Sequence, residues 1–143
     1  MGRSNVRDGL VNVLRATSGF TATDLGTVAA HDHRILNSGV DRAAIVLNDR
    51  FEQHRFTIGG VNEVNWYFSV ELWLRHNNDI PQAREDSDIY VQNIIDKINA
   101  DDTLGGSAFE SMVEAGVVVD ENIGFEGKAF LLETLTVRCQ EHI

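Results

Sequence analysis

The chain has 143 residues, of which 43% are hydrophobic and 24% charged, so it is long enough to bury a substantial core within one domain. No stretch approaches the roughly eighteen consecutive apolar residues of a membrane span, and the first residues lack the apolar segment of a signal peptide. Cys139 is the only cysteine, which excludes an intrachain disulfide and favours a reducing compartment.

Charge is unevenly distributed along the sequence. The formal net charge is −10, and residues 81–143 alone carry a net of −9, whereas residues 1–40 carry a net of +1. Most of the surface should therefore repel phosphate groups, which disfavours tight binding of nucleic acids.

The first part of the chain predicts one helix followed by a long connection. Apolar residues that recur at helical spacing predict a helix over 5–17, capped by Ser4 or Asn5. Residues 20–42 are polar and mixed, and they predict a connection with one short strand near 26–30.

The hydrophobic period then becomes two, which predicts an antiparallel series of strands. These strands cover 43–47, 51–58 and 62–75, with turns at Asn48-Asp49 and Gly59-Gly60. In the longest strand, alternate residues point to opposite faces, and only one face is uniformly apolar. The apolar set, which we expect in the core, is Trp66, Phe68, Val70, Leu72 and Leu74; the opposite set is Tyr67, Ser69, Glu71, Trp73 and Arg75.

A second, longer helix is predicted to begin near Pro81, which suits a first helical turn. Glu85, Asp86 and Asp88 are expected in the same first turn, where they would complement the helix dipole. The apolar stripe of this helix, which we expect to lie on the sheet, consists of Val91, Ile94, Ile95 and Ile98.

The last part of the chain predicts further strands. Residues 108–123 fit either a helix or a strand, although 117–119 favours a strand, and 129–139 predicts a closing strand. The sequence therefore predicts a single α+β domain over 1–143. Its antiparallel or mixed sheet has about four to six strands, with the N-terminal helix and the longer helix packed on one face.

The residues that could carry chemistry form no catalytic or cofactor-binding pattern. His31-Asp32-His33 could place two imidazoles on one face of an extended segment, but no third ligand stands at a recognisable spacing. The acids that begin the second helix are explained by its dipole, and the glycine pairs fit no phosphate-binding motif. We therefore expect no enzyme activity, no metal and no cofactor.

Tyr67 and Trp73 are the candidate interface residues on the longest strand. Both lie opposite the uniformly apolar face, on either side of Glu71. They belong either to a second, partly covered sheet face or to an aromatic anchor for a partner subunit.

The order of these elements resembles a known family. A long strand "NEVNWYFSVELWLRH", a helix, "DDTLGGSAFES" and a closing "FEGKAFLLETLTVRCQEHI" together resemble the tail terminator and tail-completion proteins of tailed bacteriophages. The resemblance implies a structural virion protein that assembles in the host cytoplasm as a six-fold ring. Its implied partners are the tail tube protein, which it caps, and a neck or head-completion protein; no membrane is involved.

In such a ring the channel must let DNA pass without binding it. The acidic excess therefore predicts a channel surface of net negative charge, because that surface repels phosphates. Like charges across a subunit seam would be costly, so we expect Arg3, Arg7 and Arg15 nearer to subunit or partner contacts.

Three other functions remain open on the sequence. The chain could be a head-completion protein or another neck adaptor, which share much of this architecture. It could also be a small metal-dependent or ligand-binding enzyme that uses His31 and His33, or an adaptor that recognises a peptide by strand addition.

Overall fold

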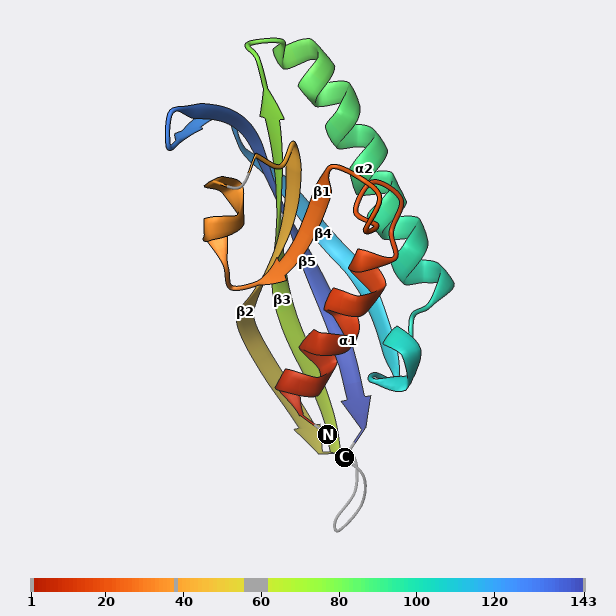
Figure 1. The fold of residues 1–143 in the computed structure, drawn as a ribbon. Helices are drawn as coiled ribbons and strands as arrows, with labels where there is room; N and C mark the ends of the chain where they lie inside the picture. Colours follow the sequence, from red (N-terminus) through yellow and green to blue (C-terminus); the bar gives the residue numbers. More distant parts are fainter. Residues whose placement is uncertain (1, 38, 56–61, 143) are drawn as a thin grey trace.

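The structure is a computed structural model, and it describes residues 2–37, 39–55 and 62–142. Five strands form one mixed sheet in the order β1-β2-β3-β5-β4, with two helices on one face (Figure 1). This arrangement confirms the α+β class with an N-terminal helix and a second, longer helix. The elements are α1 (Arg3–Arg15), β1 (Gly26–Ala30), the short 3₁₀ helix η1 (His33–Asn37), β2 (Arg42–Arg55), β3 (Asn62–His76), α2 (Ile80–Ala100), the 3₁₀ turn η2 (Leu104–Gly106), β4 (Glu110–Phe125) and β5 (Lys128–His142).

Helix α1 begins and ends two residues earlier than the sequence predicts. Gly2 occupies the N-cap position and no side chain caps the helix, so the prediction that Ser4 or Asn5 does so is wrong. Gly9 lies inside the helix because a Cβ there would stand 2.6 Å from the Cβ of Ser107. Close packing against the segment after η2 therefore accounts for a glycine that weakens the isolated helix.

The connection from residue 16 to residue 41 contains the predicted strand. Strand β1 pairs parallel with the first part of β2, from Gly26 beside Arg42 to Ala30 beside Val46. A parallel pair needs a crossover, and here η1 lies in that crossover.

Strand β2 is continuous, so the predicted turn at Asn48-Asp49 is wrong. The strand instead has a register shift against β3 between Asn48 and Phe51, which marks a β-bulge. A bulge accommodates an extra residue and bends a strand without ending it. The turn predicted at Gly59-Gly60 lies outside the described residues.

Strand β3 is the centre of the sheet, and both of its faces are buried along much of its length. Its uniformly apolar face packs under α1 and α2, as predicted; we call this side of the sheet the helix face. The core on the helix face includes Val6, Leu10, Leu14, Phe68, Val70, Leu72, Ile94 and Ile98, all fully buried. The opposite face carries a second core, which agrees with the second, partly covered sheet face that was one alternative for Trp73. It consists of Leu36, Ala43, Ile45, Trp73, Phe130 and Leu132.

Helix α2 begins as predicted, with Pro81 in its first turn. Its N-cap is Asp79, whose side chain accepts a hydrogen bond from the backbone N–H of Gln82 at 3.2 Å. The first turn contains no acid, so Glu85, Asp86 and Asp88 lie one turn later than predicted.

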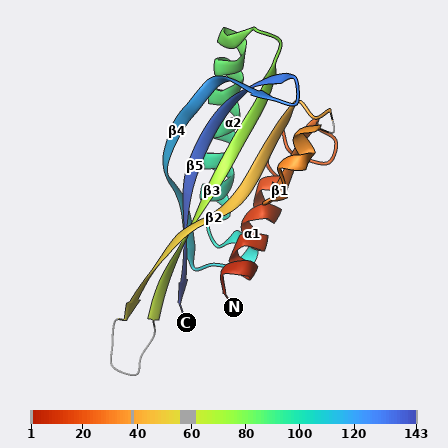
Figure 2. The ribbon, with the colours of Figure 1, turned by 90° about the vertical axis from the view of Figure 1, so that its left-hand side faces the viewer.

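The ambiguous segment 108–123 is largely a strand. Strand β4 forms one edge of the sheet and pairs antiparallel with β5 alone (Figure 2). Glu126 and Gly127 connect the two strands, and both have positive φ (50° and 77°), which is typical of a tight two-residue hairpin turn. Among the described helices, none is both long enough and apolar enough to cross a membrane.

Replacement of Leu72 tests the assignment of the helix face. Leu72 is fully buried at the middle of β3, so Leu72→Ala should lower the free energy of unfolding by about 2–5 kcal/mol. Ile89 on α2 is exposed, and Ile89→Ala is the matched control, with a change of about 0.5 kcal/mol or less. Chemical denaturation measures both values. Equal losses from the two variants would show that the helix face is assigned wrongly.

Candidate functional site

The structure separates His31 and His33 instead of bringing them together. The Nε2 atom of His31 lies 3.2 Å from Nη1 of Arg7 in α1, on the helix face of the sheet. The guanidinium can only donate, so His31 accepts through Nε2 and is neutral in this contact. The pKa of His31 is lowered, first by partial burial of the ring and then by the positive charges of Arg7 and Arg3.

His33 belongs to the opposite face. Its Nε2 atom lies 2.7 Å from Oε1 of Glu71, and its ring meets the ring of Trp73 edge-on, with 6.2 Å between centroids. Glu71 also accepts a hydrogen bond from Nε1 of Trp73 at 3.3 Å. The two imidazoles therefore have separate structural partners. Within residues 2–37, 39–55 and 62–142, no group of three or more His, Cys, Asp or Glu could hold a metal ion.

The carboxylates of α2 have local roles or face solvent. Asp86 accepts a hydrogen bond from the side-chain amide of Gln82 at 3.0 Å, one turn earlier in the helix. Glu85 and Asp88 are exposed on the outside of α2. No described contact pairs these carboxylates in a geometry for acid–base chemistry.

Cys139 is not placed as a nucleophile. The side chain is fully buried in the core on the helix face, and this burial raises the pKa of the thiol to about 12. A thiol with so high a pKa is almost entirely protonated at neutral pH, and the thiol form is a weak nucleophile.

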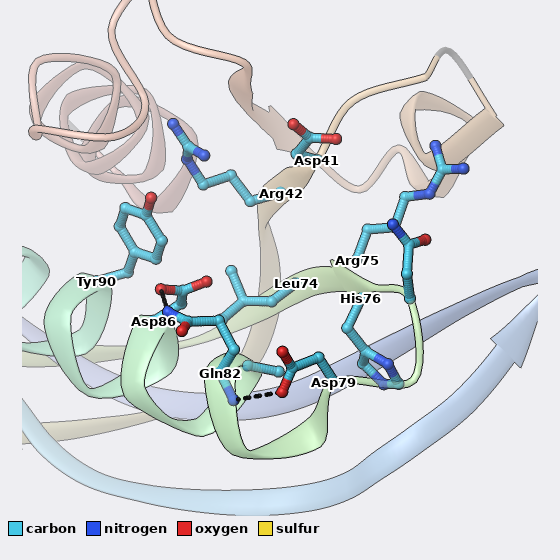
Figure 3. A pocket seen from close by; sticks show the side chains of 11 residues that line it. Asp41, Arg42, Leu74, Arg75, His76, Asp79, Gln82, Asp86 and Tyr90 are labelled. Carbon is cyan, nitrogen blue, oxygen red and sulfur yellow. Dashed lines mark hydrogen bonds between the residues drawn. The ribbon is translucent and has the colours of Figure 1, made fainter.

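An open hollow of about 520 Å³ lies where the end of β3 meets the start of α2 (Figure 3). Several polar side chains line it, but their described contacts are structural. Arg42 donates to the carbonyl of Gly19 at 2.6 Å and stacks on Tyr90, and Asp79 caps α2. His76 bonds the carbonyl of Glu121 through Nε2 at 2.9 Å. No buried side-chain atom without a partner lies in this hollow among the described residues, so nothing in it calls for a ligand.

Tyr67 and Trp73 are more buried than their predicted role requires. Each is only 6% exposed, which agrees with the alternative of a second, covered sheet face and not with that of an aromatic anchor for a partner subunit. Trp73 lies in the second core, with Phe130 edge-on at 5.7 Å between ring centroids. The guanidinium of Arg50 lies 3.7 Å from the ring centre of Tyr67 and covers it. Neither aromatic side chain offers much surface to a partner.

Two of the three candidate arginines, Arg7 and Arg15, contact the β1–β2 side of the sheet, whereas Arg3 lies over the central strand β3. Arg3 lies 5.9 Å from the ring centre of Trp66, and Arg7 donates to the side chain of Asn48 at 3.2 Å. Arg15 donates to the backbone carbonyl of Val28 in β1 at 3.4 Å. The contacts of Arg7 and Arg15 place positive charge along the β1–β2 side, which is the side farther from β4.

Strand β4 is the exposed feature that the sequence prediction missed. Residues 114–120 are all exposed, including Val117 (60%), Val118 (48%) and Val119 (55%). A run of three exposed β-branched apolar residues on an edge strand is unusual, because such edges invite pairing with another chain. The signal in the sequence was this valine run, but only the sheet order shows that it lies at an edge.

The opposite side of the sheet has a second open edge. Strand β1 pairs only with Arg42–Val46, so the remaining residues of β2, 47–55, have no strand outside them among the described residues; we call them the outer half of β2. Residues 49–55 are all exposed, and Phe51 is 57% exposed. Figure 2 shows this part of the β2–β3 hairpin extending beyond the start of α1.

A scan of the chain against protein-family models and a search of curated proteins each find no match. The two edges of the sheet and the charges beside them are the features that bear on function.

Replacement of Arg7 tests the environment of His31. Arg7→Met removes one cause of the lowered pKa, so the titration midpoint of His31 should rise while staying below the ordinary value of about 6.5, since burial remains. Proton–carbon NMR titration of the imidazole measures it. Arg34→Met is the matched control and should leave the midpoint unchanged, because Arg34 pairs with Asp32.

The same lowered pKa gives the direction of the pH effect on stability. The folded state binds a proton at His31 less readily than the unfolded chain does. The contribution of His31 to the free energy of unfolding is therefore fully present above about pH 6.5 and decreases as the pH falls below that value. A His31 midpoint above the ordinary value would contradict the contact with Arg7.

Proposed function

We propose that this protein is a structural subunit of a closed ring, of the kind formed by the phage tail terminators that its sequence resembles. In this role it caps the tail tube and forms the joint to the neck. A ring of identical subunits needs two different, complementary surfaces on each subunit.

The two unlike edges of one sheet are the observation that supports this proposal. Strand β4 has four acids and no Lys or Arg: Glu110, Glu114, Asp120 and Glu121. Glu114 and Glu121 are paired with Arg138 and Arg84 of the same copy. The other side of the sheet carries Arg7, Arg15, Arg50 and Arg55 together with two acids, Asp49 and Glu52, and Glu52 is paired with Arg50. Head-to-tail contact between copies therefore joins an acidic edge to a side with more arginines than acids, whereas contact between two β4 edges brings acids together.

The excess acid of the C-terminal half fits a channel wall. Glu85, Asp88 and Asp96 are exposed along α2, on the side that faces away from the sheet. We propose that a surface of this net charge faces the channel, so that DNA slides past without binding. A neck adaptor would use similar surfaces. Binding of this protein to a ring near the head, and not to the tail tube, would identify it as such an adaptor.

The mass of the free protein tests the ring. Native mass spectrometry and light scattering, from micromolar to millimolar concentration, should show a closed species of about six times 15.9 kDa. The ring should dissociate at high salt, because the contacts join opposite charges. The position of the gene beside genes for tail tube and neck proteins is an independent check. A monomer at every concentration, encoded away from such genes, would refute the proposal.

A further inference from the structure

We propose that β4 of one copy adds as a strand to the β1–β2 edge of the next copy, which joins the sheets of neighbouring subunits around the ring. This inference rests on the proposed function, because it specifies the contact within that ring. Its occupant is a second copy of this chain, and four observations support it.

The first observation is strand direction. Three pairs of neighbouring strands are antiparallel: β2 with β3, β3 with β5, and β5 with β4. The fourth pair, β1 with β2, is parallel. β4 therefore runs opposite to both β1 and β2. When a copy is rotated about an axis roughly along the strands, its β4 meets the next copy's β1–β2 edge antiparallel. Antiparallel pairing can therefore join the two sheets while both copies keep the same orientation along the ring axis.

The second observation is the level of each segment along the strands. Following the register across the sheet, Ser111 of β4 is level with Cys139, Trp66 and Phe51. The first residues of β4, 110–113, thus lie at the height of the outer half of β2. If the neighbouring copy is not shifted along the strand axis, residues 110–113 of one copy therefore face the outer half of β2 of the other.

The same register places the exposed valines at the height of β1. Val118 is level with Glu133, Leu72, Ala44 and finally Val28. By the same path Val117 is level with Ala29, and Gly116 with Ala30. Gly116, Ala29 and Ala30 are small and would let the strands approach closely, and the contact would cover the exposed valines that one copy leaves in water.

The third observation is the first of three register shifts in β4. The register against β5 shifts between Val113 and Ala115, between the segment level with the outer half of β2 and the segment level with β1. Strand β1 lies one strand farther out than β2, so a partner strand must bend between them. A bulge bends an antiparallel strand at such a point.

The fourth observation is charge. Asp120 is level with Thr27, next to Val28, whose carbonyl accepts a hydrogen bond from Arg15. The contact therefore brings an exposed carboxylate of β4 towards a guanidinium of the next copy. Two β4 strands paired with each other would instead bring their carboxylates together, which disfavours a two-fold dimer through this edge.

Cysteine pairs test the contact directly. Ala29→Cys and Val117→Cys, mixed in equal amounts and oxidised, should form a heterodimer, and a chain that carries both changes should form cross-linked rings. Cys139 can stay in place because it is buried. Ala29→Cys mixed with Ile89→Cys, an exposed position on α2, is the matched control and should not cross-link.

The outcomes separate this contact from the ring itself. Rings that form without an Ala29–Val117 cross-link would overturn the contact and leave the proposed function standing. Efficient cross-linking of Val117→Cys with itself would overturn it in favour of two-fold pairing. A protein that forms neither rings nor cross-links would refute this contact, and it would refute the proposed function as well when its gene lies away from tail tube and neck genes.

A charged substitution gives a second measurement. Val117→Lys places a charge in the apolar part of the contact, so it should raise the dissociation constant of the ring at least about tenfold and leave the melting temperature of the subunit unchanged. Ile89→Lys, the control on α2, should change neither. Rings of unaltered affinity from Val117→Lys would contradict the proposal.

Discussion

The burial of β3 on both faces is the constraint on which the rest of this structure depends. One set of its side chains packs under α1 and α2, and part of the alternate set packs in the second core with η1 and the β4–β5 end. Because β3 pairs with β2 and β5 along almost its whole length, it also fixes the positions of the remaining strands. The helices, the 3₁₀ turn and both open edges are placed relative to this strand.

The second core explains why the residues with the most chemical character are not arranged as a site. Trp73 fills that core, Glu71 accepts from its indole N–H, and His33 contacts both. These polar atoms satisfy one another at the border of a buried cluster, as buried polar groups generally must. On the helix face, His31 is tied to Arg7 in the same way. The histidines thus contribute to the joints between elements.

The surfaces that remain open are the two edges of the sheet. An edge strand keeps unpaired backbone donors and acceptors, and natural proteins usually protect such edges with charge, proline or bulges. Here β4 combines bulges and acids with three exposed valines, while arginines border the other side. This combination suits an edge that avoids pairing with its own kind yet accepts a neighbour of complementary charge. It is the feature on which the proposed head-to-tail assembly rests.

The sequence by itself determined the elements whose signals are local. The alternation in β3 identified the face that contains Leu72, and Pro81 located the start of α2. These features follow from periodicity and backbone preferences, which act over a few residues. The turn predicted at Asn48-Asp49 failed because the same polar residues also suit a bulge, and pairing with β3 decides between them.

Only the tertiary structure decided which surfaces are buried and which are open. Tyr67 and Trp73 became buried because Arg50 and the second core cover them, and those partners are distant in the sequence or come from another element. The valines of β4 look like a core strand until the sheet order places them at the edge. Strand order and the packing of opposite faces depend on long-range contacts, and no local pattern of residues encodes them.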